Sequence, residues 1–297
     1  MFKNLKGIGL LLVANLLIMV ALGIVYQVLA NFILPAFGID IRGSVNTSLL
    51  VYALLLGFGG AFISLAFSKQ IARSMLQGYQ VTAPKTRQEE VVFRAVQEQS
   101  QRLRVKMPEV WIYEAPDPNA FATGPTKNNA MVAVSTGLLA NMNEAEARAV
   151  LAHEMGHVYN GDMFTMTVLS GLMNTFVYFI AMWVQRLFAE RDQHMLGMVV
   201  SIVLQIALGF LALIVVGWFS RRREFEADRF SAKAYGPSPM VSALQSISRF
   251  KEEAEQQNAL TDPLATMKIS GDTGRWMRVF ATHPPIEERI AALQRFA

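Results

Sequence analysis

The chain has 297 residues, of which 53% are hydrophobic and 17% are charged. Soluble proteins average about 45–50% apolar and about 25% charged residues, so this composition excludes a disordered chain and argues against an ordinary soluble enzyme. The net charge is +4, but the basic residues lie mainly beside apolar runs and no base-reading motif is present, so we expect no nucleic-acid partner.

Four stretches contain no Asp, Glu, Lys or Arg: 7–39, 43–68, 163–185 and 193–220. Each exceeds the ~20 residues that a helix needs to cross a bilayer, and together they predict two transmembrane hairpins, 1–68 and 163–220. The first stretch is too long for a typical signal-peptide core and predicts an uncleaved anchor, with cleavage after Ala30 as the alternative. The last two stretches contain glutamines, so the alternative for the hairpin 163–220 is that it packs against protein instead of crossing the membrane.

Basic residues flank these stretches on one side. Lys3 and Lys6 precede the first, a basic region beginning at Lys69 follows the second, and Arg221–Arg223 follow the fourth. By the positive-inside rule, both termini and the region 69–162 lie in the cytoplasm, and the loops near 39–46 and 186–194 lie on the other side. Membrane lipids are therefore expected partners.

The region 69–162 has mixed helix and strand signals. Gln88–Arg104 has helical spacing, whereas Val110–Tyr113 and Ala130–Ser135 are short β-rich runs. Ala120–Ala122 is a short segment between two turn clusters. The region 221–297 is predicted to be mostly helical, with an irregular stretch near Thr261–Thr273. The expected fold is a mainly α membrane protein with two helical hairpins and a small α+β domain.

A well-delimited helix is predicted for Asn143–Asn160. Asn143 can cap its start together with Glu146, and Gly161 can end it. Inside lies His153-Glu154-Met155-Gly156-His157, which places both imidazoles on one helical face with Glu154 beside them. This is the HExxH arrangement of two zinc ligands and a general base. The chain has no cysteine and only four histidines, so a chance match is improbable.

A catalytic zinc usually has three protein ligands and one open position. Glu224 and Asp228 lie four residues apart on one helical face, which favours Glu224 as the ligand and Asp228 as an acceptor that orients an imidazole. From spacing alone, a charged helix surface is the alternative. His283 and His194 are rival ligands, although His194 lies in the loop predicted for the far side.

Five stretches, in this order, resemble the HtpX family of integral-membrane zinc metalloproteases, which is related to the CAAX prenyl endopeptidases. They are Asn119–Gly124 (NAFATG), Ala133–Leu139 (AVSTGLL), Leu151–Asp162 (LAHEMGHVYNGD), Arg223–Asp228 (REFEAD) and Thr282–Pro285 (THPP). The family's E-x-x-x-D pattern falls on Glu224 and Asp228, which supports Glu224 as the third ligand.

The resemblance implies a zincin-like catalytic part at 69–162 and a third zinc ligand supplied by 221–297, with one Zn²⁺ per chain. It also implies a bacterial inner-membrane protease of the heat-shock and envelope-stress response. Such a protease cleaves damaged or misassembled membrane proteins and cleaves itself. We expect its active site on the cytoplasmic side.

The protein substrate is expected to bind in extended form. An edge strand near Asn119–Ala122 can add a peptide by β-augmentation, so Asn119 and Phe121 are predicted substrate contacts, with Phe121 as a core residue the alternative. His283 is a further candidate donor to the substrate, or else part of the turn before a helix at Ile286–Phe296.

Two other functions compete with broad proteolysis. A non-enzymatic membrane scaffold would keep the site without using it, and the predicted spans carry no charge that would mark an ion pathway. A narrow-specificity, CAAX-like protease would need a larger intramembrane chamber than four spans enclose. The sequence leaves the oligomeric state open.

Overall fold

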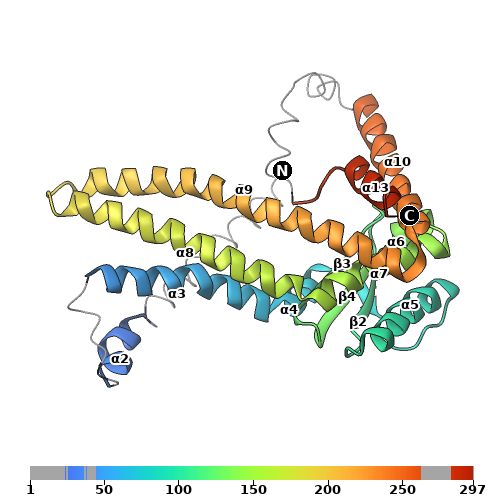
Figure 1. Cartoon of the computed structure of the whole chain (residues 1–297), viewed down its shortest axis with the longest axis horizontal. Coiled ribbons are helices and arrows are strands. Elements are labelled where there is room, and N and C mark those ends of the chain that lie inside the picture. The colour runs from blue at the N-terminus through green and yellow to red at the C-terminus, as the bar shows by residue number, and fades with distance from the viewer. Residues whose placement is uncertain (1–23, 25, 37, 39–44, 262–281, 297) are drawn as a thin grey trace. The chain divides into compact units, whose positions relative to one another are not determined.

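The computed structural model describes residues 24, 26–36, 38, 45–261 and 282–296. This part of the chain is mostly helical and contains a four-stranded sheet (Figure 1). It divides into two compact units. One comprises the described parts of Met1–Ser64 and Thr167–Leu213, and the other those of Leu65–Met166 and Ile214–Ala297.

Three helices of the described chain are long and apolar enough to cross a membrane: α3 (Val45–Ala66), α8 (Asp162–Ala189) and α9 (His194–Tyr235). They correspond to the second, third and fourth apolar stretches of the sequence. Most of the first stretch lies outside the described residues. Its described end forms a π-helical turn, Leu29–Ile33, followed by the short helix α2 (Leu34–Ala36).

Glycines allow close helix contacts in the first unit. A Cβ atom at Gly57 of α3 would lie 2.5 Å from the backbone nitrogen of Thr175 in α8, and one at Gly171 would lie 2.4 Å from the ring of Phe58. No real Cβ tolerates such distances, so the α3–α8 contact requires both glycines. Near the α8–α9 turn, a Cβ at Gly197 would likewise lie 2.8 Å from Phe188.

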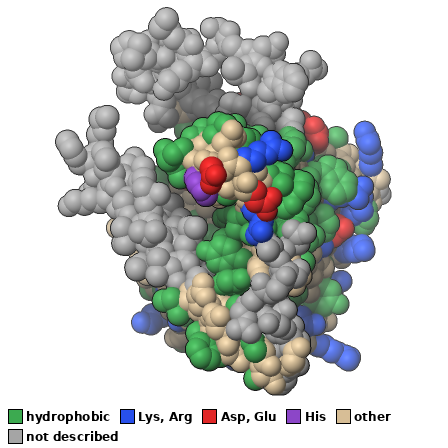
Figure 2. All heavy atoms as spheres, turned by 90° about the vertical axis from the view of Figure 1, so that its left-hand side faces the viewer, with side chains coloured by type: hydrophobic (Ala, Val, Ile, Leu, Met, Phe, Trp, Pro, Cys, Tyr) green, Lys and Arg blue, Asp and Glu red, His purple; other side chains and the backbone are tan. Residues whose placement is uncertain are grey.

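The turn that joins α8 to α9 is the charged end of an otherwise apolar pair of helices. Arg186 forms an ion pair with Glu190 at 2.8 Å, and Asp192 adopts a left-handed conformation (φ 56°) that reverses the chain. Figure 2 shows acidic, basic and histidine side chains gathered in one group on this face, with hydrophobic side chains around them. This distribution is typical of a polar loop between two membrane-buried helices.

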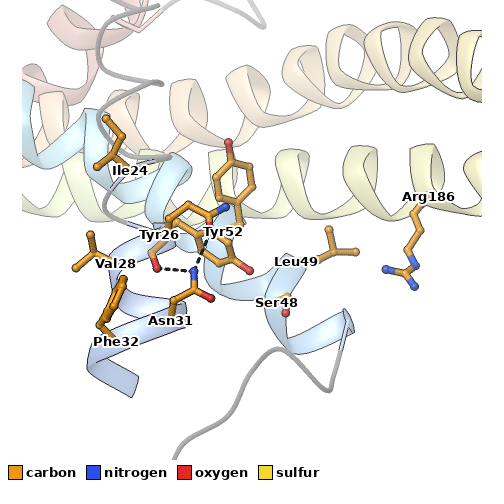
Figure 3. A pocket seen from close by; sticks show the side chains of 10 residues that line it. Ile24, Tyr26, Val28, Asn31, Phe32, Ser48, Leu49, Tyr52 and Arg186 are labelled. Carbon is orange, nitrogen blue, oxygen red and sulfur yellow. Dashed lines mark hydrogen bonds between the residues drawn. The ribbon is translucent and has the colours of Figure 1, made fainter. Parts of the chain in front are cut away.

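The first unit also contains a cavity of about 660 Å³ (Figure 3). Its wall is mainly apolar, and the rings of Tyr26 and Tyr52 meet edge to face there with centroids 5.2 Å apart. Asn31 Nδ2 donates to the backbone oxygen of Gln27 at 2.9 Å. The residues that line this cavity include no histidine or carboxylate, so they offer no metal site.

The sheet of the second unit has the order β1-β2-β4-β3, with β2 and β4 parallel and the other pairs antiparallel. Strands β2 (Glu109–Tyr113) and β4 (Asn129–Ser135) confirm the two predicted runs. The segment expected between turns begins β3 (Ala120–Thr126), which is an edge strand. Strand β1 (Gly78–Gln80) was not predicted, because its three residues are all exposed and show no alternation.

Helices cover both faces of this sheet. On one face, α5 (Arg87–Leu103) and α7 (Glu144–Asn160) bury the main apolar core, which includes Val92, Val132 and Leu151. On the other face, α4 (Ser68–Met75) packs over a smaller cluster around Met131 and Ala133. Helix α6 (Thr136–Asn141) follows β4, while α10 (Pro237–Thr261) contacts α7 and α13 (Ile286–Gln294) contacts α10.

Candidate metal centre

Local capping fixes the ends of α7. Asn143 Oδ1 accepts from the backbone N–H of Glu146, and the Glu146 carboxylate accepts from the backbone N–H of Asn143, both at 3.0 Å. Gly161 ends the helix in a left-handed conformation (φ 69°). Both predicted helix boundaries are confirmed. The helix is buried along most of its length, so His153 and Glu154 point into the protein, at 5% and 9% exposure.

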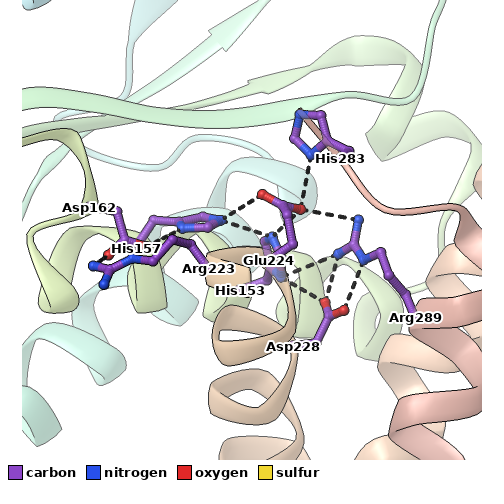
Figure 4. A network of polar contacts seen from close by, with 8 residues as sticks. All are labelled: His153, His157, Asp162, Arg223, Glu224, Asp228, His283 and Arg289. Carbon is purple, nitrogen blue, oxygen red and sulfur yellow. Dashed lines mark hydrogen bonds and ion pairs between the residues drawn. The ribbon is translucent and has the colours of Figure 1, made fainter. Parts of the chain in front are cut away.

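Three donor atoms meet beside this helix (Figure 4). The Nε2 atoms of His153 and His157 lie 3.2 Å apart, and Glu224 places its carboxylate oxygens 3.3 Å from the second imidazole and 3.6 Å from the first. In a tetrahedral zinc site with bonds of about 2.0–2.1 Å, neighbouring ligand atoms are separated by about 3.3 Å. Among the described residues, this group can hold a metal ion.

The buried Glu224 carboxylate supports this interpretation. Its Oε2 atom is enclosed and accepts no hydrogen bond from the described residues, although His283 Nδ1 and Arg289 Nη1 form ion-pair contacts with it at 3.0 and 3.4 Å. A buried carboxylate oxygen without a hydrogen bond is costly. Likewise, two imidazole nitrogens that face each other at 3.2 Å can share only one proton. A bound cation would satisfy all of these atoms together.

Each histidine is oriented by a carboxylate on its other ring nitrogen. His153 Nδ1 lies 2.9 Å from Asp228, and His157 Nδ1 lies 2.7 Å from Asp162. With Nδ1–H donating to these carboxylates, the Nε2 lone pairs face the shared point between the ligands, as metal-binding histidines require. The structure thus brings Asp228 to the position expected from the sequence. Asp162 was not singled out, although it closes the LAHEMGHVYNGD stretch that carried the family resemblance.

Two arginines complete the network, and neither was predicted. Arg289 of α13 donates two hydrogen bonds to Asp228, at 2.6 and 2.8 Å, and its Nη1 lies 3.4 Å from Glu224. Burial would lower the pKa of the Arg289 guanidinium, but the hydrogen bonds to Asp228 raise it, so the side chain stays charged. Arg223 donates a single hydrogen bond, from Nη2, to Asp162.

Glu154 lines a cavity of about 400 Å³ together with the three donor residues and the segment 119–122. Burial raises the pKa of the Glu154 carboxyl above its ordinary value. A carboxyl group with a raised pKa beside a metal site is suited to taking up and releasing a proton.

The predicted substrate residues line the same cavity. Asn119 donates its backbone N–H to Ser135 at the start of β3, and the half-buried Phe121 packs against Tyr113 with ring centroids 6.0 Å apart. Phe121 therefore has both a core contact and a cavity contact. His283 lies at the mouth, with 68% of its side chain exposed, and the neighbouring Glu224 carboxylate raises its imidazole pKa.

His194 begins α9 in the other unit and is not part of the donor group. Glu224 comes from the same helix because α9 continues without a break past residue 220 as far as Tyr235. Gly156 allows this helix to approach α7, since a Cβ there would lie 3.2 Å from Phe230.

A second cavity, of about 610 Å³, adjoins the first and shares Asn119 and His283 with it. Leu244, Ile247 and Phe250 of α10 form much of its apolar wall. Asp117, Lys251 and Arg289 also line this cavity, so its surface combines an apolar wall with charged side chains.

The buried donor group, the adjacent Glu154 and the three apolar helices define a membrane metalloprotease. The chain belongs to peptidase family M48, whose profile matches residues 86–297.

Relatives similar to nearly the whole chain include Protease HtpX of Idiomarina loihiensis, which is 41% identical over 98% of this chain and 99% of its own length. Protease HtpX of Pasteurella multocida is 43% identical over 95% of this chain and 98% of its own. The Protease HtpX homolog of Nitrosomonas europaea is 44% identical over 97% and 99%. The resemblance found in the sequence is thus confirmed.

The crystal structure of S. mikatae Ste24p has a similar fold, with a TM-score of 0.58 and 18% identity. The match covers 92% of this chain and 62% of that one.

Proposed function

We propose that this metalloprotease is a zinc endopeptidase in which His153, His157 and Glu224 hold the ion and Glu154 moves the proton. The observation that carries the proposal is the set of separations of 3.2–3.6 Å among the two Nε2 atoms and the two carboxylate oxygens of Glu224, together with a buried Glu224 oxygen that accepts no hydrogen bond. Two imidazoles and one carboxylate in tetrahedral array are the ligands that a catalytic zinc site uses.

His153, His157 and Glu224 would hold the ion, and bound zinc would supply Lewis acidity for the peptide carbonyl and for the attacking water. Glu154 accepts the proton of that water and delivers it to the leaving amine. The raised pKa of Glu154 favours its protonated form, which it adopts between these two proton transfers. Asp228 and Asp162 keep the imidazole rings in the orientation that points Nε2 at the ion.

The substrate is proposed to lie extended along the edge strand β3. Asn119 and Phe121 line the cavity that also contains the donor group, and His283 lies at its mouth. Backbone pairing to an edge strand accepts many sequences, and the apolar wall that α10 contributes to the adjoining cavity suits the apolar side chains of membrane proteins. This combination favours broad specificity over a narrow, CAAX-like one.

The proposed topology has four spans in two hairpins, with 69–162 and 221–297 forming a zincin-like catalytic domain on the cytoplasmic side. Three apolar helices and the basic residues that follow α3 and the apolar part of α9 support it. The resemblance to the HtpX relatives supports the further proposal that the chain is a bacterial inner-membrane enzyme that removes damaged membrane proteins in the stress response and cleaves itself.

The test uses full-length wild type and Glu154→Gln, purified in detergent with a chelator and then given one equivalent of zinc. Cleavage of an unfolded casein-like protein is followed on a gel, and bound zinc is measured by mass spectrometry. We expect wild type to cut casein and itself only with zinc, while Glu154→Gln binds zinc and remains inert.

Three results would contradict parts of this proposal. Failure of wild type to bind zinc would favour a scaffold. Zinc binding without casein cleavage would favour a narrow-specificity protease. Equal cleavage by both proteins would refute the role of Glu154.

A further inference from the structure

One side of helix α4 packs against the sheet. Ala72 and Leu76 pack against the cluster around Met131 and Ala133. Lys69 and Arg73 each form an ion pair with Glu109 of β2, at 2.6 and 2.5 Å. These contacts attach α4 firmly to the sheet and fix which side of the helix points away from it.

The opposite side of α4, together with Phe67 directly before the helix, presents three large apolar side chains. Phe67, Ile71 and Met75 are 54%, 45% and 78% exposed. Every fourth residue advances about 40° around a helix, so these three side chains form one narrow stripe. Scattered exposed apolar residues are ordinary, but an aligned stripe on an amphipathic helix indicates a surface that meets something apolar.

Chain connectivity indicates what that surface meets. The apolar helix α3 ends at Ala66, and Phe67 alone separates it from α4. The eight residues of α4 extend only about 12 Å at 1.5 Å per residue. The whole stripe therefore lies within a short distance of the point where a membrane-spanning helix leaves the bilayer. Interfacial helices bury their apolar face about 5–10 Å deep at the boundary between headgroups and acyl chains.

We propose that Phe67, Ile71 and Met75 insert into the lipid–water interface of the bilayer, so that α4 lies along the membrane surface between the lipid and the sheet. The partner is the phospholipid surface itself. This inference rests on the exposure of the stripe and its connection to α3, and it holds independently of the metal centre.

The proposal has a consequence for substrates, which does rest on the proposed function. Helix α4 contacts the edge strand β3, and Phe121 belongs to the cluster on which α4 packs. A helix fixed at the interface would hold β3 close to the bilayer surface. An unfolded segment that leaves the membrane would then have only a short distance to cross through water before it reached β3.

The absence of cysteine from the chain allows a direct test. Single cysteines are introduced by Ile71→Cys and Met75→Cys, and the full-length variants are labelled with an environment-sensitive fluorophore and reconstituted into phosphatidylcholine nanodiscs. Gln70→Cys, on the same helix but outside the stripe, and Gln101→Cys on α5 are matched controls at exposed positions. Aqueous iodide and a lipid-attached nitroxide are the two quenchers.

We expect labels at 71 and 75 to be quenched by the nitroxide, with iodide quenching several-fold weaker than at 70 and 101. Iodide quenching equal to that of the controls would place the stripe in water and overturn the proposal. Protection from both quenchers would show that protein covers the stripe, which would also overturn it. Neither readout depends on zinc or on proteolysis, so failure here is distinct from failure of the proposed function.

Discussion

The contact between Asp228 and Arg289 allows the two roles of Asp228 to be separated. The carboxylate is 2% exposed, accepts two hydrogen bonds from Arg289 and also lies 2.9 Å from His153 Nδ1. Removing one partner of a buried ion pair costs about 3–5 kcal/mol, because the other charge is left unpaired. We therefore expect Asp228→Ala to lower the free energy of unfolding by about 3–5 kcal/mol. The ion pair between Arg289 and Glu224, at 3.4 Å, would reduce this loss because it partly compensates the charge of Arg289.

Loss of the acceptor for His153 has a different consequence. Partners that orient metal-binding histidines contribute about 10–100-fold to metal affinity. Replacing both partners of a buried pair by apolar residues is often neutral for stability. The double variant Asp228→Ala/Arg289→Met should therefore recover most of the lost stability, while its zinc affinity stays about 10–100-fold below wild type.

The assay measures thermal unfolding of the metal-free proteins in detergent and zinc affinity by competition with a chelating indicator. Glu226→Gln is the matched control, because it removes a carboxylate from the same helix at a side chain that is 53% exposed. If the double variant recovers zinc affinity as well, Asp228 acts only through Arg289 and the reasoning about His153 is wrong. If Asp228→Ala is as stable as wild type, the buried Asp228–Arg289 ion pair does not contribute to the free energy of unfolding, and the stability argument is wrong.

Three further predictions concern the donor group, the helix contact and the adjoining cavity. Glu224→Gln should lose stoichiometric zinc in mass spectrometry while Glu226→Gln keeps it, and equal zinc content would refute Glu224 as a ligand. Gly156→Val should lower stability by about 1–3 kcal/mol through overpacking against Phe230, which a thermal melt would detect and an unchanged melting temperature would contradict. Ile247→Trp should shift cleavage towards sites with smaller side chains in a digest analysed by mass spectrometry, whereas an unchanged site distribution would exclude this cavity from substrate binding.

The C-terminal helix α13 has a direct part in the metal centre. Arg289 reaches from this helix to Asp228 and approaches His153 and Glu224, so the chain's last helix helps to set the charge around the donor group. Leu293 of the same helix is buried with Met240 of α10, which holds α13 in place. Damage to α13 would therefore affect the metal centre as well as the packing of the domain.

Local signals in the sequence determined the part of the site carried by α7. A capping box, a glycine stop and two histidines four residues apart act within one or two helical turns, so they define the helix and the shared face of His153 and His157 without tertiary information. The apolar helices are predictable for a similar reason, since length and lack of charge are properties of a single segment. Helix α9 continues past its apolar part because no glycine or proline lies between Trp218 and Tyr235, and it ends before Gly236 and Pro237.

The distant charges that complete the site are brought together by contacts between segments far apart in the sequence. Arg289 and Asp228 are 61 residues apart, and so are Arg223 and Asp162, and no local pattern relates such positions. The sequence already indicated an edge strand near Asn119–Ala122, but its pairing with β4 depends on a contact between separate segments. The exposed stripe of α4 likewise depends on which side of the helix packs on the sheet. The pattern within a segment predicts whether it forms a helix, a strand or a membrane span. Which segments contact one another depends instead on how charged groups and apolar surfaces are buried in the folded chain.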